Sequence, residues 1–151
     1  MIAVDQKVLD AFSKDYSIQS NIGATIDINC NTLIDFKDDA VEAKKQLAEN
    51  RKNLDNDAWA TVIVDYYLGT KSHDEVFAAA KVGLTHPKEY AERLCEAYFY
   101  LAKQAASNGQ YQQAANFYRL TLATNIYDFV EHRYARIELA KVKQVIEQST
   151  P

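Results

Sequence analysis

Few side chains in this chain are of a type and spacing that could do covalent chemistry. Its strongest nucleophiles are two cysteines, Cys30 and Cys95, and Cys95 with a distant histidine is the one pairing on offer. The four glycines are isolated at positions 23, 69, 83 and 109, so neither a nucleophile elbow, nor a phosphate-binding loop, nor a dinucleotide fingerprint is present. We therefore expect no catalytic residues and no cofactor.

Metal binding is equally unsupported by the sequence. No spacing of histidine, cysteine or carboxylate residues resembles a zinc or calcium site. The two cysteines form no CxxC pair, which leaves two alternatives open: a disulfide in an oxidising compartment, or two buried thiols.

Binding chemistry is better represented. Glu96, Phe99 and Lys103 follow one another at three- and four-residue spacing, and Arg133 and Ile137 repeat that spacing further on. An aromatic ring beside two cations suits a peptide with an apolar side chain and a free or side-chain carboxylate. The alternative is that Phe99 packs against a neighbouring helix while both cations are solvated.

Composition limits the classes of protein that could hold these residues. Apolar residues make up 48% and charged residues 25%, as in folded soluble domains. Only four glycines and two prolines occur, which favours long helices over a turn-rich β fold. The net charge of −4 comes without a basic cluster, so we expect no nucleic-acid partner. We also expect no transmembrane segment, because no stretch approaches the roughly 20 apolar residues required.

Periodicity and capping signals predict a chain of helices. Residues 1–39 form a divergent segment, with a short helix over 4–14 and an unassigned stretch over 16–36. Residues 40–148 form the main helical domain. Its first expected helix covers 39–53, the second runs from Asp57 to a stop at Gly69, and the third opens at a capping box over 72–75. A further helix covers 87–107, and the last one runs from a capping box at Asp128 and Glu131 to about residue 147.

The stretch from Cys95 to Asn125 resembles one tetratricopeptide (TPR) unit, a helix–turn–helix that stacks on its neighbours. With Cys95 as repeat position 1, the large and small positions of the motif are filled in order by Tyr98, Leu101, Ala102, Ala114 and Tyr118, with Gly109 at the turn. The preceding helix pair is a degenerate unit, and the last helix carries a half-repeat that caps the stack. This register predicts a concave groove that is lined by Glu96, Phe99, Lys103 and Ala106 of the first repeat helix. Arg133 and Ile137 of the last helix face the same groove.

Three further anchors resemble a particular family, the NlpI-type TPR lipoproteins of Gram-negative outer membranes. The first is Trp59 with the segment IVDYYLG at 63–69, similar to that family's W…IVEFYLG. The second is FYLAK at 99–103, similar to NFYLGK. The third is FVEHRYA at 129–135, followed by Glu138 and Leu139, similar to FVEHRYALLEL. The resemblance covers about residues 40–142 and corresponds to the C-terminal half of the family.

The resemblance implies a non-enzymatic periplasmic scaffold, because family members hold peptidoglycan hydrolases and a tail-specific protease. The start of the chain lacks the basic and apolar regions of a secretory signal. The location is therefore periplasmic or outer-membrane associated if a leader has been removed, and cytoplasmic otherwise. The alternative function is a cytosolic TPR chaperone or regulatory module for an extended partner segment, and a homodimer is open in both cases.

Overall fold

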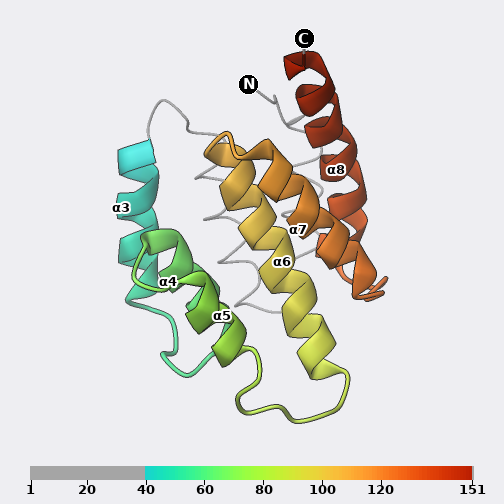
Figure 1. Ribbon diagram of the computed structural model, residues 1–151. Coiled ribbons are helices and arrows are strands. Elements are labelled where there is room, and N and C mark those ends of the chain that lie inside the picture. The colour runs from blue at the N-terminus through green and yellow to red at the C-terminus, as the bar shows by residue number, and fades with distance from the viewer. Residues whose placement is uncertain (1–39, 151) are drawn as a thin grey trace. The chain divides into compact units, whose positions relative to one another are not determined.

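The computed structural model describes residues 40–150, which fold into helices without a strand (Figure 1). This confirms the predicted all-helical class and its TPR-like stack. The helix expected over 4–14, the unassigned stretch 16–36 and Cys30 lie outside the described residues. The described chain divides between Ala79 and Ala80 into two compact units. The helices are α3 (Ala40–Arg51), α4 (Trp59–Leu68), α5 (His73–Ala79), α6 (Glu89–Ser107), α7 (Tyr111–Ala123) and α8 (Val130–Ser149).

In the first unit, α3 packs against α4, and α4 against α5. The Arg51 guanidinium at the end of α3 joins α4 through a two-pronged ion pair: Nε lies 2.6 Å from Asp65 Oδ1, and Nη2 lies 3.3 Å from Oδ2. This geometry is the stronger form of an arginine–carboxylate pair. In addition, Leu47 of α3 is buried.

The predicted stop and start signals between α4 and α5 are confirmed. Gly69 adopts the left-handed conformation, with φ 81°, and ends α4. The capping box then opens α5: the Ser72 amide donates to Glu75 Oε2 at 2.7 Å, and the Glu75 amide donates to Ser72 Oγ at 3.3 Å. The helix expected from Asp57 begins two residues later, at Trp59, because Asp57 is held in a turn by Asp55 Oδ1.

In the second unit, α6 and α7 form an antiparallel hairpin and α8 packs along α7 (Figure 1). Four of the predicted repeat positions are buried, namely Leu101, Ala102, Ala114 and Tyr118. Tyr98, at the first large position, is half-buried and stacks on Phe117 with ring centres 6.3 Å apart. Gly109 makes the turn with φ 76°. The interfaces hold fully buried alanines, which allow the helices to approach closely; these are Ala97, Ala102, Ala114, Ala115 and Ala135.

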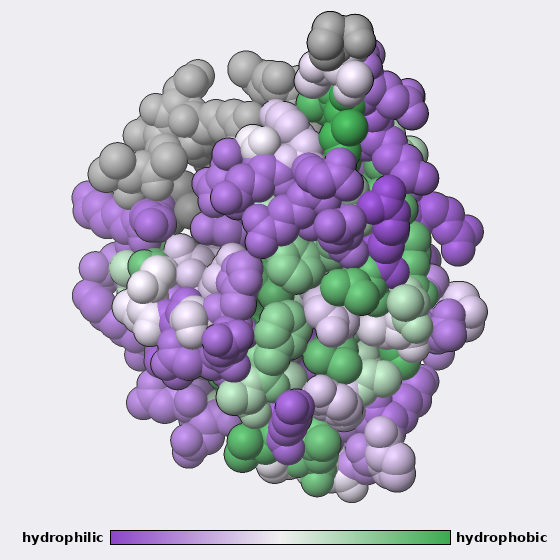
Figure 2. Space-filling view, in the orientation of Figure 1, coloured by the Kyte–Doolittle hydropathy of each residue, from purple (hydrophilic) through white to green (hydrophobic). Residues whose placement is uncertain are grey.

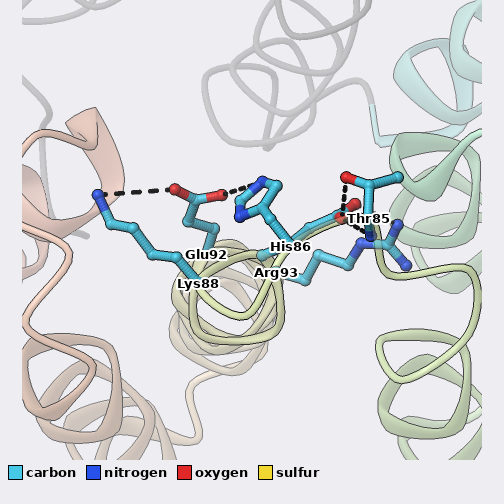
Figure 3. A network of polar contacts seen from close by, with 6 residues as sticks. Thr85, His86, Lys88, Glu92 and Arg93 are labelled. Carbon is cyan, nitrogen blue, oxygen red and sulfur yellow. Dashed lines mark hydrogen bonds and ion pairs between the residues drawn. The ribbon is translucent and has the colours of Figure 1, made fainter.

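The start of α6 is fixed by a polar network (Figure 3). The Glu89 carboxylate accepts from the Thr85 amide at 2.5 Å, from the Thr85 hydroxyl at 2.8 Å and from Arg93 Nη2 at 2.6 Å. Arg93 Nη1 also donates to the Val82 carbonyl oxygen at 2.6 Å. These contacts lower the pKa of Glu89 to about 2, chiefly through the hydrogen bonds from Thr85. The helix consequently begins at Glu89, two residues after the expected position 87.

The capping box predicted at Asp128 and Glu131 is wrong. The N-cap of α8 is Phe129, and no side chain caps this end of the helix. Glu131 is instead buried, with 2% of its surface exposed, and accepts a hydrogen bond from the Tyr100 hydroxyl. The Asp128 carbonyl oxygen accepts from Arg133 Nη2 at 3.3 Å. Glu131 therefore joins α8 to α6 instead of capping its own helix.

Candidate protein-binding surface

The five residues predicted to bind a peptide lie on two helices of the second unit. Glu96, Phe99 and Lys103 belong to α6, the first helix of the repeat, and Arg133 and Ile137 belong to α8. On each helix the three- or four-residue spacing places the side chains on one face. The two sets differ in burial, and this difference decides which residues a partner can reach.

On α6, the structure brings Phe99 and Lys103 together inside the protein. The Lys103 ammonium lies 5.4 Å from the centre of the Phe99 ring, a cation–π contact, and both side chains are buried. The Phe99 ring also meets Tyr118 of α7 edge-on, with ring centres 6.0 Å apart. Glu96 and Ala106 are half-buried. A partner therefore reaches Phe99 and Lys103 only after a rearrangement.

On α8, Arg133 and Ile137 are directly accessible. Ile137 is 45% exposed, which is unusual for a large aliphatic side chain. Arg133 is exposed and makes the hydrogen bond to the Asp128 carbonyl described above. These two residues are the part of the predicted set that a partner meets first.

The residue pair Tyr100 and Glu131 was not predicted from the sequence. The Tyr100 hydroxyl in α6 donates to Glu131 Oε1 in α8 at 3.3 Å, so this bond links the two helices that carry the candidate residues. A signal was present in the sequence, because Glu131, Ala135, Glu138 and Val142 share one helical face. All four are buried.

His132 is buried between α8 and the turn that precedes it. Its Nε2 lies 3.0 Å from the Leu122 carbonyl oxygen, and its ring meets Tyr127 edge-on at 4.8 Å. These contacts anchor the first turn of α8 to the end of α7, which gives His132 a structural role.

Cys95 is a buried free thiol at the first repeat position. Burial raises its pKa to about 12. A thiol nucleophile acts as the thiolate, and this environment opposes thiolate formation.

A shallow depression of about 480 Å³ lies between the start of α7 and the end of α8. It is lined by Gly109, Gln110, Tyr111, Gln112, Gln113, Ile146, Ser149 and Thr150. None of the five predicted binding residues belongs to it.

Across residues 40–150, no group of three or more histidine, cysteine or carboxylate side chains is placed to hold a metal ion. None of the helices from α3 to α8 combines the length and the apolar character that crossing a membrane requires.

Comparison with known proteins supports the resemblance seen in the sequence. No protein-family model matches the chain. The chain is similar to a curated protein of Haemophilus influenzae, the lipoprotein NlpI homolog, with 44% identity over 104 residues. The match covers 69% of this chain but 33% of that protein, so the chain spans about a third of its relative. Over the 104 aligned residues, the comparison supports the resemblance of this chain to the NlpI-type lipoprotein family.

Proposed function

We propose that this protein is a non-enzymatic TPR scaffold of the bacterial envelope, which brings together protein partners of the peptidoglycan-hydrolase or protease type. The carrying observation is a TPR hairpin closed by a capping helix in a chain that is 44% identical to an NlpI homolog over 104 residues. Stacked helical repeats expose extended surfaces to partner proteins. The predicted surface consists of Glu96, Phe99 and Lys103 on α6 with Arg133 and Ile137 on α8.

Partner binding is proposed to begin on α8, because Arg133 and Ile137 are exposed whereas Phe99 and Lys103 are buried. A guanidinium near an aliphatic side chain offers a partner one charged and one apolar contact. Phe99 and Lys103, the buried pair on α6, contribute to binding only when a partner binds tightly enough to rearrange the helices that cover them.

The test is affinity capture from separated envelope and cytosolic extracts, with the bound proteins identified by mass spectrometry. The wild-type chain should capture peptidoglycan hydrolases or a protease from the envelope extract, and Arg133→Glu with Ile137→Ser should reduce that capture. The matched control is Lys52→Glu with Val82→Ser, which changes one cation and one aliphatic side chain at positions that are 67% and 69% exposed. Circular dichroism confirms that both variants remain helical.

Equal capture by the two double variants would contradict the proposed surface. Capture of an extended cytosolic client, with nothing retained from the envelope, would instead favour the alternative of a cytosolic chaperone or regulatory module.

A further inference from the structure

Helix α8 exposes three of its four cations and buries two of its three acids. Its first two acids, Glu131 and Glu138, are buried and used internally: Glu131 accepts from Tyr100, and Glu138 pairs with Lys141 at 3.0 Å. Arg133, Arg136 and Lys143 point to the solvent. Over the described length of α8, Glu147 in the last turn is the one acid on the exposed side. The outer edge of α8, at the right of Figure 2, is accordingly mostly hydrophilic, whereas apolar groups gather over α6.

This arrangement does not stabilise the helix. Arg133 lies in the first turn, where the helix dipole disfavours a cation, and Glu147 lies in the last turn, where it disfavours an anion. Arg133 and Arg136 are also like charges three residues apart, which destabilises a helix slightly. Arg133 gains one hydrogen bond, to the Asp128 carbonyl oxygen. Within the described part of the chain, neither Arg136 nor Lys143 makes an ion pair that would explain its place in the helix. Exposed cations that do not stabilise their own helix are typical of a functional surface.

The same face carries an apolar contact between its charges. In helical register, Arg133, Arg136, Ile137, Ala140 and Lys143 share one side of α8, and all of them are exposed. Ala140 is small enough for another backbone to come close, and Ile137 stands beside it. We name these five residues the basic face.

Charge balance favours a protein partner with the opposite sign. Residues 80–151 carry nine basic and seven acidic side chains, whereas the first 79 carry eight and fourteen. Three cations around one aliphatic side chain provide too few phosphate contacts for a nucleic acid and too little apolar surface for a membrane. They match carboxylates spaced around one apolar side chain, as on an acidic amphipathic helix.

We propose that the basic face of α8 binds an acidic segment of a partner protein, whose carboxylates contact Arg133, Arg136 and Lys143 while an apolar side chain rests on Ile137 and Ala140. This inference rests on the proposed scaffold function and adds to it the chemistry of the partner. If the acidic segment is helical, it would lie along α8. Its carboxylates, three and four residues apart, would then face the cations of α8, which share one side of that helix.

The experiment titrates the full chain against a fluorescent acidic peptide and follows fluorescence anisotropy. The peptide, of about 18 residues or five helical turns, carries glutamates three and four residues apart around one leucine. A second peptide has glutamine in place of every glutamate. We expect the first to bind, and the second to bind at least about tenfold more weakly, because the charged contacts supply the specificity.

The variant Arg136→Glu with Lys143→Glu should weaken binding of the acidic peptide by at least about tenfold, and raising the salt from about 0.05 M to about 0.3 M should weaken wild-type binding. Both side chains are exposed, so the fold is retained, which circular dichroism verifies. The control, Lys52→Glu with Lys81→Glu, makes the same charge change at exposed positions elsewhere and should bind as the wild type does.

The proposal is overturned if the acidic and glutamine peptides bind equally or if the α8 variant binds as the control does. It is also overturned if phosphatidylglycerol vesicles or duplex DNA bind this face as tightly as the peptide. Dimerisation that the α8 variant abolishes would overturn it as well, because the occupant would then be a second copy of the chain. Loss of peptide binding alone leaves envelope capture intact, so the failure of this inference is distinguishable from the failure of the scaffold function.

Discussion

The Tyr100 hydroxyl in α6 donates a hydrogen bond to the buried Glu131 carboxylate in α8, across 31 positions of sequence. The bond ties the first helix of the TPR unit to the helix that caps it. The sequence predicted that Glu131 caps α8. Because its carboxylate accepts this hydrogen bond, Glu131 lies in the interior instead.

We expect Tyr100→Phe to lower the free energy of unfolding by about 1 kcal/mol, because Glu131 loses a hydrogen bond in a buried site. Urea unfolding followed by circular dichroism measures the change. Tyr127→Phe is the matched control, since it removes the same hydroxyl from a side chain that is 63% exposed. Equal effects of the two substitutions would show that the Tyr100 bond contributes nothing specific.

The network at the start of α6 predicts an acid-dependent loss of stability. The pKa of Glu89 is lowered from 4.5 to about 2, mainly by the Thr85 hydrogen bonds. A lowered pKa in the folded state means that the contribution is complete above pH 4.5 and is lost as the pH falls towards 2. In Glu89→Gln this part of the pH dependence should be absent.

The measurement is the urea midpoint at steps from about pH 6 to about pH 2, complemented by the NMR titration of the Glu89 carboxyl carbon. Glu147→Gln removes one carboxylate outside the network and should retain the pH dependence of the wild type. A Glu89 carboxyl that titrates near pH 4.5 would refute the network as described.

Gly109 is required for its backbone conformation rather than for space. Its φ is 76°, and an added Cβ would meet no atom within 4 Å. Gly109→Ala should therefore cost about 1 kcal/mol of unfolding free energy through strain alone. Gly109→Asn should cost less, since asparagine tolerates the left-handed region better. Thermal unfolding of the two variants tests this order, and a larger loss for asparagine would contradict it.

Cys95 should resist thiol reagents while the protein is folded. Its burial and raised pKa of about 12 leave little thiolate at about pH 8. In a Cys30→Ser protein, we expect no modification by Ellman's reagent under native conditions and one equivalent in denaturant. Rapid modification of the folded protein would revive the alternative of a cysteine nucleophile.

The helices themselves could be predicted because their signals are local. Gly69 and Gly109 end helices through a backbone conformation that glycine favours, and the Ser72–Glu75 box lies within four residues. The starts of α4 and α6 lie two residues later than predicted. The residues before each helix are held in turns, in which the Asp57 amide donates to Asp55 Oδ1 and the Glu89 amide donates to the His86 carbonyl oxygen.

The candidate surface was predictable only in part. Phe99 and Lys103 lie beside each other, as their spacing on one helix requires, but they do not face an open groove as the TPR register predicted. Their burial, and the inward turn of Glu131, depend on packing between helices far apart in sequence. Whether the five residues bind a partner stays a prediction.

The fully buried alanines between the helices have a consequence for how relatives of this protein can diverge. At Ala97, Ala102, Ala114, Ala115 and Ala135, any larger side chain would force the helices apart, at a typical cost of about 1–3 kcal/mol. Drift at these sites is therefore restricted to residues of similar size, whereas the outer positions of α8 tolerate almost any polar residue. If the cations at 133, 136 and 143 persist across relatives while their exposed neighbours vary, selection rather than folding is maintaining them.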